Sequence, residues 1–80
     1  MQSAEKLSGL NQGEYALVLD IKSDGSIRRR LQDLGLIKGT GVCCVQKSPL
    51  GEPVAYLIRG AVIALRHEDS SCVQIERCEV

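Results

Sequence analysis

The chain has 80 residues, enough for one small domain, and its ten basic residues balance its ten acidic residues. This neutral charge differs from the basic excess of a dedicated nucleic-acid-binding protein, and it provides no attraction to an anionic membrane. Tyr15 and Tyr56 are the only aromatic residues, so the chain lacks the rings that stack on single-stranded nucleic acid, and its core must be largely aliphatic.

Residues 1–6 are expected to form a loose tail. They contain no long apolar stretch, so no signal peptide is expected. An irregular lead-in follows, with Leu7, Leu10 and Gly13 at intervals of three. No apolar run is long enough to span a bilayer. We therefore expect a soluble, cytoplasmic protein.

The first regular element is expected at residues 14–21, where apolar and other residues alternate as in a half-buried strand. One face of this strand would carry Tyr15, Leu17, Leu19 and Ile21. The polar residues 22–25 follow, and their Asp-Gly pair could close a hairpin. A helix is the preferred interpretation, because Ser26 is a good N-cap and Ile27 opens a helical period.

The helix is predicted to end in a Schellman motif. Ile27, Leu31 and Leu34 share one helical face, and Gly35 follows at the position where a left-handed residue ends a helix. Leu36 would then pack on Leu31. Lys38 and Gly39 are expected to turn the chain into the next strand, so that the helix covers one open end of a small β-structure.

The rest of the chain alternates short apolar runs with turn residues. It predicts strands at residues 40–47, 54–58, 61–65 and 72–76, a proline-bounded loop at 48–53, a tight turn at 59–60 and a polar segment, with at most one helical turn, at 66–71. Residues 61–65 are almost wholly apolar, so either both faces are covered or one face meets a partner. Five short strands suggest a mainly β fold, a small closed barrel with one short helix between its first and second strands.

The four cysteines are interpreted as reduced thiols. Cys43 and Cys44 are adjacent, so they point to opposite faces of a strand and cannot both ligate one metal without distorting it. Cys72 and Cys78 complete the set, and no C-x-x-C spacing is present.

Catalytic and metal-binding patterns are sparse. The single histidine, His67, could pair with Cys72, but a solvated turn is the simpler interpretation. His67, Glu68 and Asp69 are adjacent and seldom converge on one ion from a turn. The glycines near the helix have neither the lysine nor the order of a phosphate-binding loop. We expect no catalytic residue, no metal site and no cofactor.

The three successive arginines at 28–30 are the strongest charge feature. They spread about 200° around a helix, so they do not form one anion-binding patch. A solvated face is favoured, and contact of one or two of them with a partner remains open.

Several spaced groups resemble the signature of the ferrous-iron transport protein A (FeoA) family over residues 7–76. They are Leu7-x-x-Leu10-x-x-Gly13, Arg29-Arg30-Leu31-x-x-Leu34-Gly35-Leu36-x-x-Gly39-x-x-Val42, Pro49-x-Gly51-x-Pro53, Arg59-Gly60, Ala64-Leu65-Arg66 and Val73-x-Ile75-Glu76. The chain departs from the family at Glu52, where Asp is usual, at Ser70, where Ala is common, and at Cys43-Cys44, which replace a mostly aliphatic pair.

This resemblance implies an SH3-like barrel with an inserted helix and a small cytoplasmic accessory role in bacterial iron(II) uptake. It implies a partner, the GTP-binding membrane transporter ferrous-iron transport protein B. From the charge balance, the few aromatic residues and the short apolar runs, we expect no binding of nucleic acid and no membrane insertion. The same fold resembles the C-terminal domain of iron-dependent repressors, so a metal-responsive sensor using Cys43, Cys44, His67 or Cys72 is the alternative. An RNA-associated barrel is a third hypothesis, which the neutral charge disfavours.

As a non-catalytic binding module, the chain would dock through its loops and the groove beside its helix. The candidate partner-binding residues are Arg29, Leu36, Ile37, Lys38, Pro49, Leu50, Gly51, Arg59 and Arg66. Ile37 and Leu50 are the expected anchors if they are exposed, and otherwise they cap the barrel.

Overall fold

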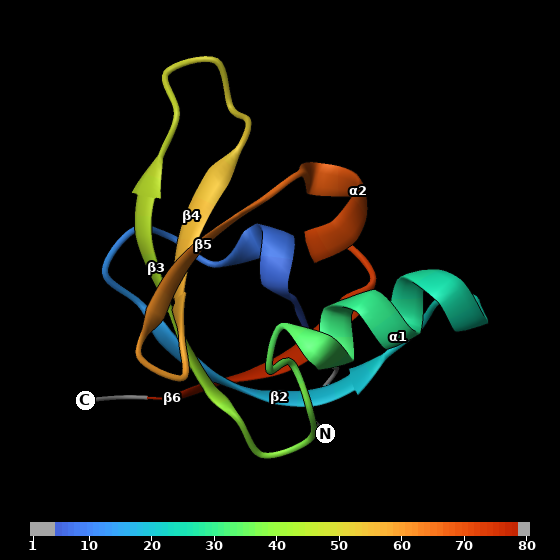
Figure 1. Cartoon of the computed structure of the whole chain (residues 1–80). Helices are drawn as coiled ribbons and strands as arrows, with labels where there is room; N and C mark the ends of the chain where they lie inside the picture. Colours follow the sequence, from blue (N-terminus) through green and yellow to red (C-terminus); the bar gives the residue numbers. More distant parts are fainter. Residues whose placement is uncertain (1–4, 79–80) are drawn as a thin grey trace.

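One antiparallel sheet of six strands curls around a single core in the computed structural model, which describes residues 5–78 (Figure 1). The strand order is β1-β6-β2-β3-β4-β5. The elements in chain order are β1 (Glu5–Lys6), the 3₁₀ turn η1 (Leu7–Gly9), β2 (Tyr15–Ile21), α1 (Gly25–Asp33), β3 (Gly41–Lys47), β4 (Val54–Ile58), β5 (Ala61–Leu65), α2 (His67–Ser70) and β6 (Val73–Cys78). Neither of the helices in this part of the chain has the length and apolar character needed to cross a membrane.

The predicted small barrel with a helix between its first two long strands is confirmed, with one strand more than expected. Its predicted closure is wrong for the described residues, because β1 and β5 lie at the two ends of the sheet and do not pair with each other. The additional strand, β1, pairs with β6 through Glu5 opposite Ile75 and Lys6 opposite Gln74. The prediction of a loose tail is therefore wrong for residues 5 and 6, while residues 1–4 lie outside the described residues. A strand of two residues carries no periodicity that a sequence could reveal.

A bulge in β2 overturns the prediction that its odd-numbered residues share one face. The register with β6 shifts between Val18 and Asp20, so Leu19 is an extra residue. Before the bulge Ala16 and Val18 point into the core, and after it Ile21 does. Because one extra residue reverses the inward side of a strand, Tyr15 is left on the outer surface.

The C-terminal end of α1 has the predicted Schellman geometry. The N–H of Leu36 donates to the carbonyl of Leu31 over 3.1 Å, and the N–H of Gly35 donates to that of Gln32 over 2.9 Å. Gly35 has φ +108°, which favours glycine, and both leucines are buried. The N-cap prediction is wrong, because the helix starts at Gly25 with Asp24 as N-cap, and Ser26 lies in the first turn.

The core is aliphatic except for one ring, that of Tyr56. Its hydroxyl donates to the carbonyl of Leu7 over 3.4 Å and so holds η1 against the sheet. Burial raises the pKa of this phenol above its ordinary value. The other core side chains are Leu7, Leu10, Ala16, Val18, Ile21, Leu31, Leu36, Val42, Cys44, Val54, Ile58, Leu65, Val73 and Ile75.

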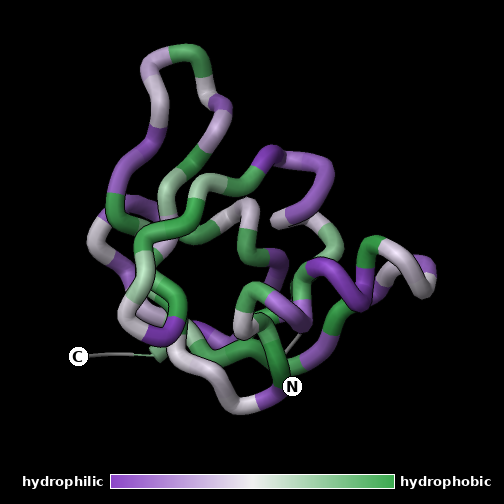
Figure 2. The backbone as a smooth tube through the Cα atoms, viewed as in Figure 1, coloured by the Kyte–Doolittle hydropathy of each residue, from purple (hydrophilic) through white to green (hydrophobic). Residues whose placement is uncertain are grey.

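β5 lies at the edge of the sheet, and most of it is exposed. Only Leu65 is buried, while Val62 retains 62% of its accessible surface. Of the two alternatives for this strand, coverage of both faces is therefore wrong, and contact of one face with a partner stays a prediction. Figure 2 shows β5 as a mainly hydrophobic segment beside a hydrophilic α2.

Candidate functional site

The connection between β3 and β4 projects from the barrel as a hairpin loop (Figure 1). Its tip is a turn in which the N–H of Gly51 donates to the carbonyl of Ser48 over 2.8 Å. The N–H of Leu50 also donates to the Ser48 hydroxyl over 3.3 Å. Leu50 is therefore held at the tip with 92% of its surface accessible, and we call residues 48–51 the hairpin tip.

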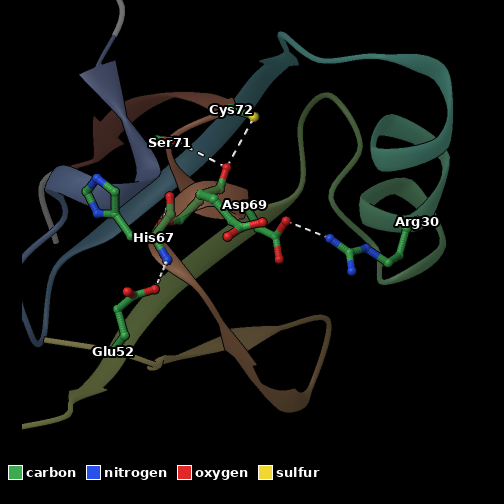
Figure 3. Close-up of polar contacts among 8 residues, drawn as sticks. Arg30, Glu52, His67, Asp69, Ser71 and Cys72 are labelled. Carbon is green, nitrogen blue, oxygen red and sulfur yellow. Dashed lines mark hydrogen bonds and ion pairs between the residues drawn. The ribbon is translucent and has the colours of Figure 1, made fainter. Parts of the chain in front are cut away.

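The base of this loop is tied to the rest of the fold through α2 (Figure 3). A carboxylate oxygen of Glu52 accepts the N–H of His67, the first residue of α2, over 2.7 Å. At the other side of α2, Asp69 accepts from Arg30 of α1 over 2.6 Å. A short helix thus joins the hairpin loop to α1.

The expected single helical turn at residues 66–71 is confirmed as α2, and His67 is exposed as expected, but the burial of Asp69 corrects the interpretation of this charged segment as a solvated turn. Asp69 retains 8% of its surface and Ser70 is also buried. The chain gives no local signal for this burial, because Arg30 lies 39 residues before Asp69 in the sequence. Neither residue was therefore singled out by sequence reasoning for this contact.

A second group of candidate residues lies beyond the end of α1. Ile37 is 43% exposed, and the N–H of Thr40 closes a turn over Lys38 and Gly39 by donating to the Ile37 carbonyl. The stem of Arg59 packs directly over Gly35, where an added Cβ would lie 2.8 Å from the Arg59 Cδ. We call Ile37, Lys38 and Arg59 the helix-end group.

The structure places the predicted partner-binding residues in more than one region. The hairpin tip follows β3 and the Ile37–Thr40 turn precedes it, so these regions lie at opposite ends of that strand. Leu36 is fully buried and is a core residue with no surface to offer a partner. Arg29 lines a shallow hollow on α1 with Ser26 and other residues of the same helix, and Arg66 precedes α2.

The three successive arginines have three different environments. Arg28 donates to the carbonyl of Ile21 and lies 3.6 Å from Asp20, whereas Arg30 pairs with Asp69. The N–H of Ile21, and then Lys22 and Arg28, hold the pKa of Asp20 below its ordinary value. The prediction that these arginines diverge rather than form one patch is confirmed.

The cysteines adopt the predicted opposite orientations in β3, with Cys44 buried and Cys43 partly exposed. The thiol of Cys72 donates to the carbonyl of Glu68 over 3.3 Å. Within residues 5–78, no group of three histidine, cysteine or acidic side chains lies close enough together to hold a metal ion.

We expect Cys44 to react with iodoacetamide far more slowly than Cys43, Cys72 or Cys78 in the folded protein. Burial raises the pKa of the Cys44 thiol, so less of the reactive thiolate is present, and the core also blocks access. Mass spectrometry of digests after timed labelling measures this order. Equal rates for the four cysteines in folded protein would contradict the described burial, and equal rates in urea provide the control.

The chain is similar to known proteins in sequence as well as in fold. A family model described as FeoA domain matches residues 5–77. A curated relative is the Fe(2+) transport protein A/Fe(2+) transporter FeoB fusion protein of Porphyromonas gingivalis (strain ATCC BAA-308 / W83), which is 32% identical over 71 residues. The match takes in 89% of this chain but only 8% of the fusion protein.

Two solved structures extend the comparison to the fold. The zinc complex of Stenotrophomonas maltophilia FeoA, described as a prokaryotic SH3 domain protein, superposes with a TM-score of 0.80 at 32% identity, over 90% of this chain and 89% of that one. A FeoA-like protein from Clostridium acetobutylicum gives a TM-score of 0.90 at 25% identity, over 100% of this chain and 93% of that one.

Proposed function

Because the chain belongs to the FeoA domain family, we propose that it is a non-catalytic accessory protein of ferrous iron uptake that binds the transporter FeoB on its cytoplasmic side. The fusion of an FeoA-like segment with FeoB in the Porphyromonas gingivalis relative supports this association, because fused domains are often separate, interacting chains elsewhere. The domain would act by docking to FeoB and would catalyse no reaction of its own.

The exposure of Leu50 is the observation that carries the docking proposal. A large aliphatic side chain at the tip of a projecting loop adds nothing to the core, yet the Ser48 turn fixes its position. Pre-positioned apolar residues are effective anchors, because a partner pocket buries them at little cost in conformational entropy. Residues 52 and 67 hold the base of the loop, so the tip is presented on a braced hairpin.

Leu50→Asp is expected to weaken binding to FeoB-containing membranes by about 10- to 100-fold. This range corresponds to the binding free energy lost when one leucine side chain is no longer buried in the partner. The fold of the variant should be unchanged, because the side chain is 92% exposed and contacts no core residue. The measurement is co-sedimentation of the intact chain with membranes that contain or lack FeoB, in the presence and absence of guanine nucleotide. Circular dichroism of each variant confirms folding.

Two further variants locate the surface. Leu50→Met preserves an apolar side chain of similar volume and should bind as the unsubstituted chain does. Ile37→Asp tests the helix-end group at the opposite end of β3. Full binding by Leu50→Asp would remove the hairpin tip from the interface, and equal sedimentation with both membrane types would overturn the proposed association itself.

A further inference from the structure

The free edge of β5 lacks three of the features that usually protect a sheet edge. The strand, Ala61–Leu65, contains no charged residue and no proline, and its register with β4 is continuous and without a bulge. Natural proteins normally use one of these devices at an exposed edge, since an open edge accepts strands from other chains. β5 is therefore a candidate site for such pairing.

The turn between β4 and β5 determines which backbone groups face outward. Ile58 is paired with Ala61 across a two-residue turn in which both Arg59 and Gly60 have positive φ, +51° and +84°. Residues that flank such a turn form a hydrogen-bonded pair, and hydrogen-bonded pairs alternate along an antiparallel ladder. The N–H and C=O groups of Val62 and Ala64 consequently point away from β4.

These outward groups have no other partner in the described chain. None of the turn, loop or helix-capping backbone bonds among residues 5–78 involves Val62 or Ala64. The outer face next to them is apolar, because Val62 is opposite Leu57, Leu57 is opposite Cys43, and Cys43 is opposite Tyr15. An added strand would thus gain backbone hydrogen bonds and an apolar neighbour along one side.

The charges at the two ends of β5 select the kind of strand. Arg59 precedes the strand by two residues and Arg66 follows it directly, and neither forms an ion pair within the described chain. A second copy pairing antiparallel about Ile63 would bring its own Arg59 towards Arg66, which is a like-charge contact. A segment with acidic residues at its ends would instead meet an arginine at each end.

We infer that β5 binds an extended aliphatic segment of another protein, flanked by acidic residues, through strand addition to its free edge. The pairing uses the backbone of Val62 and Ala64, and the two arginines orient the segment. This surface is separate from the hairpin tip, although it shares Arg59 with the helix-end group. Its test uses a peptide and no FeoB, so the result does not depend on the proposed function.

The probe is the heptapeptide acetyl-Glu-Val-Thr-Val-Thr-Val-Glu-amide, added to the full chain labelled with ¹⁵N. We expect saturable shifts of the Val62 and Ala64 amides and inter-strand contacts from peptide protons to β5. Two N-methylated peptides provide matched controls, one methylated at the valine amides and the other at the threonine amides. Only one edge of the peptide faces β5, so exactly one of them should lose binding.

Ala64→Pro is the decisive protein variant, because it removes an outward N–H while leaving the ladder to β4 intact. It should weaken peptide binding about tenfold, whereas Ala64→Val retains the N–H and should bind normally. Should Ala64→Pro lower the melting temperature, the charge test remains. Arg59→Glu combined with Arg66→Glu should weaken binding of this peptide and strengthen binding of the version with lysine in place of both glutamates.

Three outcomes would overturn the inference. They are shifts that spread over the barrel without reaching saturation, equal binding of the two N-methylated peptides, and sedimentation as a dimer that Ala64→Pro returns to monomer. The last result would make a second copy of this chain the occupant of the edge.

Discussion

Tyr56→Ala is expected to destabilise the domain by about 3–5 kcal/mol, the range for removing a buried aromatic side chain. The ring of Tyr56 is the largest fully buried side chain and the only aromatic one in the core. Its hydroxyl also bonds the Leu7 carbonyl, so the substitution both opens a cavity and releases η1. Because small domains are stabilised by only about 5–15 kcal/mol, the variant should be close to unfolding.

Two variants separate the contributions of the ring and the hydroxyl. Tyr56→Phe removes only the hydrogen bond and should cost about 1 kcal/mol. Tyr15→Ala removes the same side chain from the outer face of β2, where it is 45% exposed, and should cost less than about 1 kcal/mol. Urea unfolding followed by far-ultraviolet circular dichroism measures all three. A loss for Tyr56→Ala no larger than that for Tyr15→Ala would contradict the described core.

The features predicted correctly from the sequence are those whose causes are local. The end of α1 depends on the spacing of Leu31, Gly35 and Leu36 within six consecutive residues, and this spacing can be seen directly in the sequence. β4 was bounded in the same way, by Pro53 before it and the Arg59-Gly60 turn after it, and that turn also marks the start of β5. The loop at residues 48–53 was identified because its two prolines and Gly51 are typical turn residues.

The features that were missed depend on contacts between distant parts of the chain. The extra residue in β2, Leu19, is revealed only by the shift in its pairing with β6, some 55 residues later. Asp69 is buried because Arg30 reaches it from α1. The exposure of β5 follows from its place at the sheet edge, whereas an apolar run alone is equally typical of a strand covered on both sides.

Among the candidate partner-binding residues, too, exposure was predicted correctly where its cause is local and wrongly where it depends on packing. Leu50 and Ile37 are exposed, which is the condition under which they are expected to be anchors, and the anchor role itself stays a prediction. Both lie in turns that the sequence defines. Leu36 was placed beside them in the sequence but is in the core, because the Schellman motif turns it inward to meet Leu31. A single loop therefore supplies one exposed and one buried residue at adjacent positions.

Gly35→Ala is expected to cost about 3 kcal/mol, because it combines backbone strain with a collision. At φ +108° any side chain is strained, and the new Cβ would lie 2.8 Å from Arg59 Cδ and 3.2 Å from Ile58 Cγ2. Gly39→Ala is the matched control, because Gly39 has φ +89° but nothing within 4 Å of an added Cβ. The loss of stability in Gly39→Ala should therefore reflect the backbone strain alone, about 1–2 kcal/mol.

Comparing the two glycines shows how α1 is held over the end of the barrel. Because Arg59 makes the nearest contact, Arg59→Ala should recover most of the excess cost of Gly35→Ala over Gly39→Ala, while the backbone strain and the 3.2 Å contact with Ile58 Cγ2 remain. Urea unfolding of the single and double variants gives this coupling energy directly. Equal losses at the two glycines, with no coupling to Arg59, would mean that the helix end is fixed by its own turn rather than by the β4–β5 hairpin packed against it.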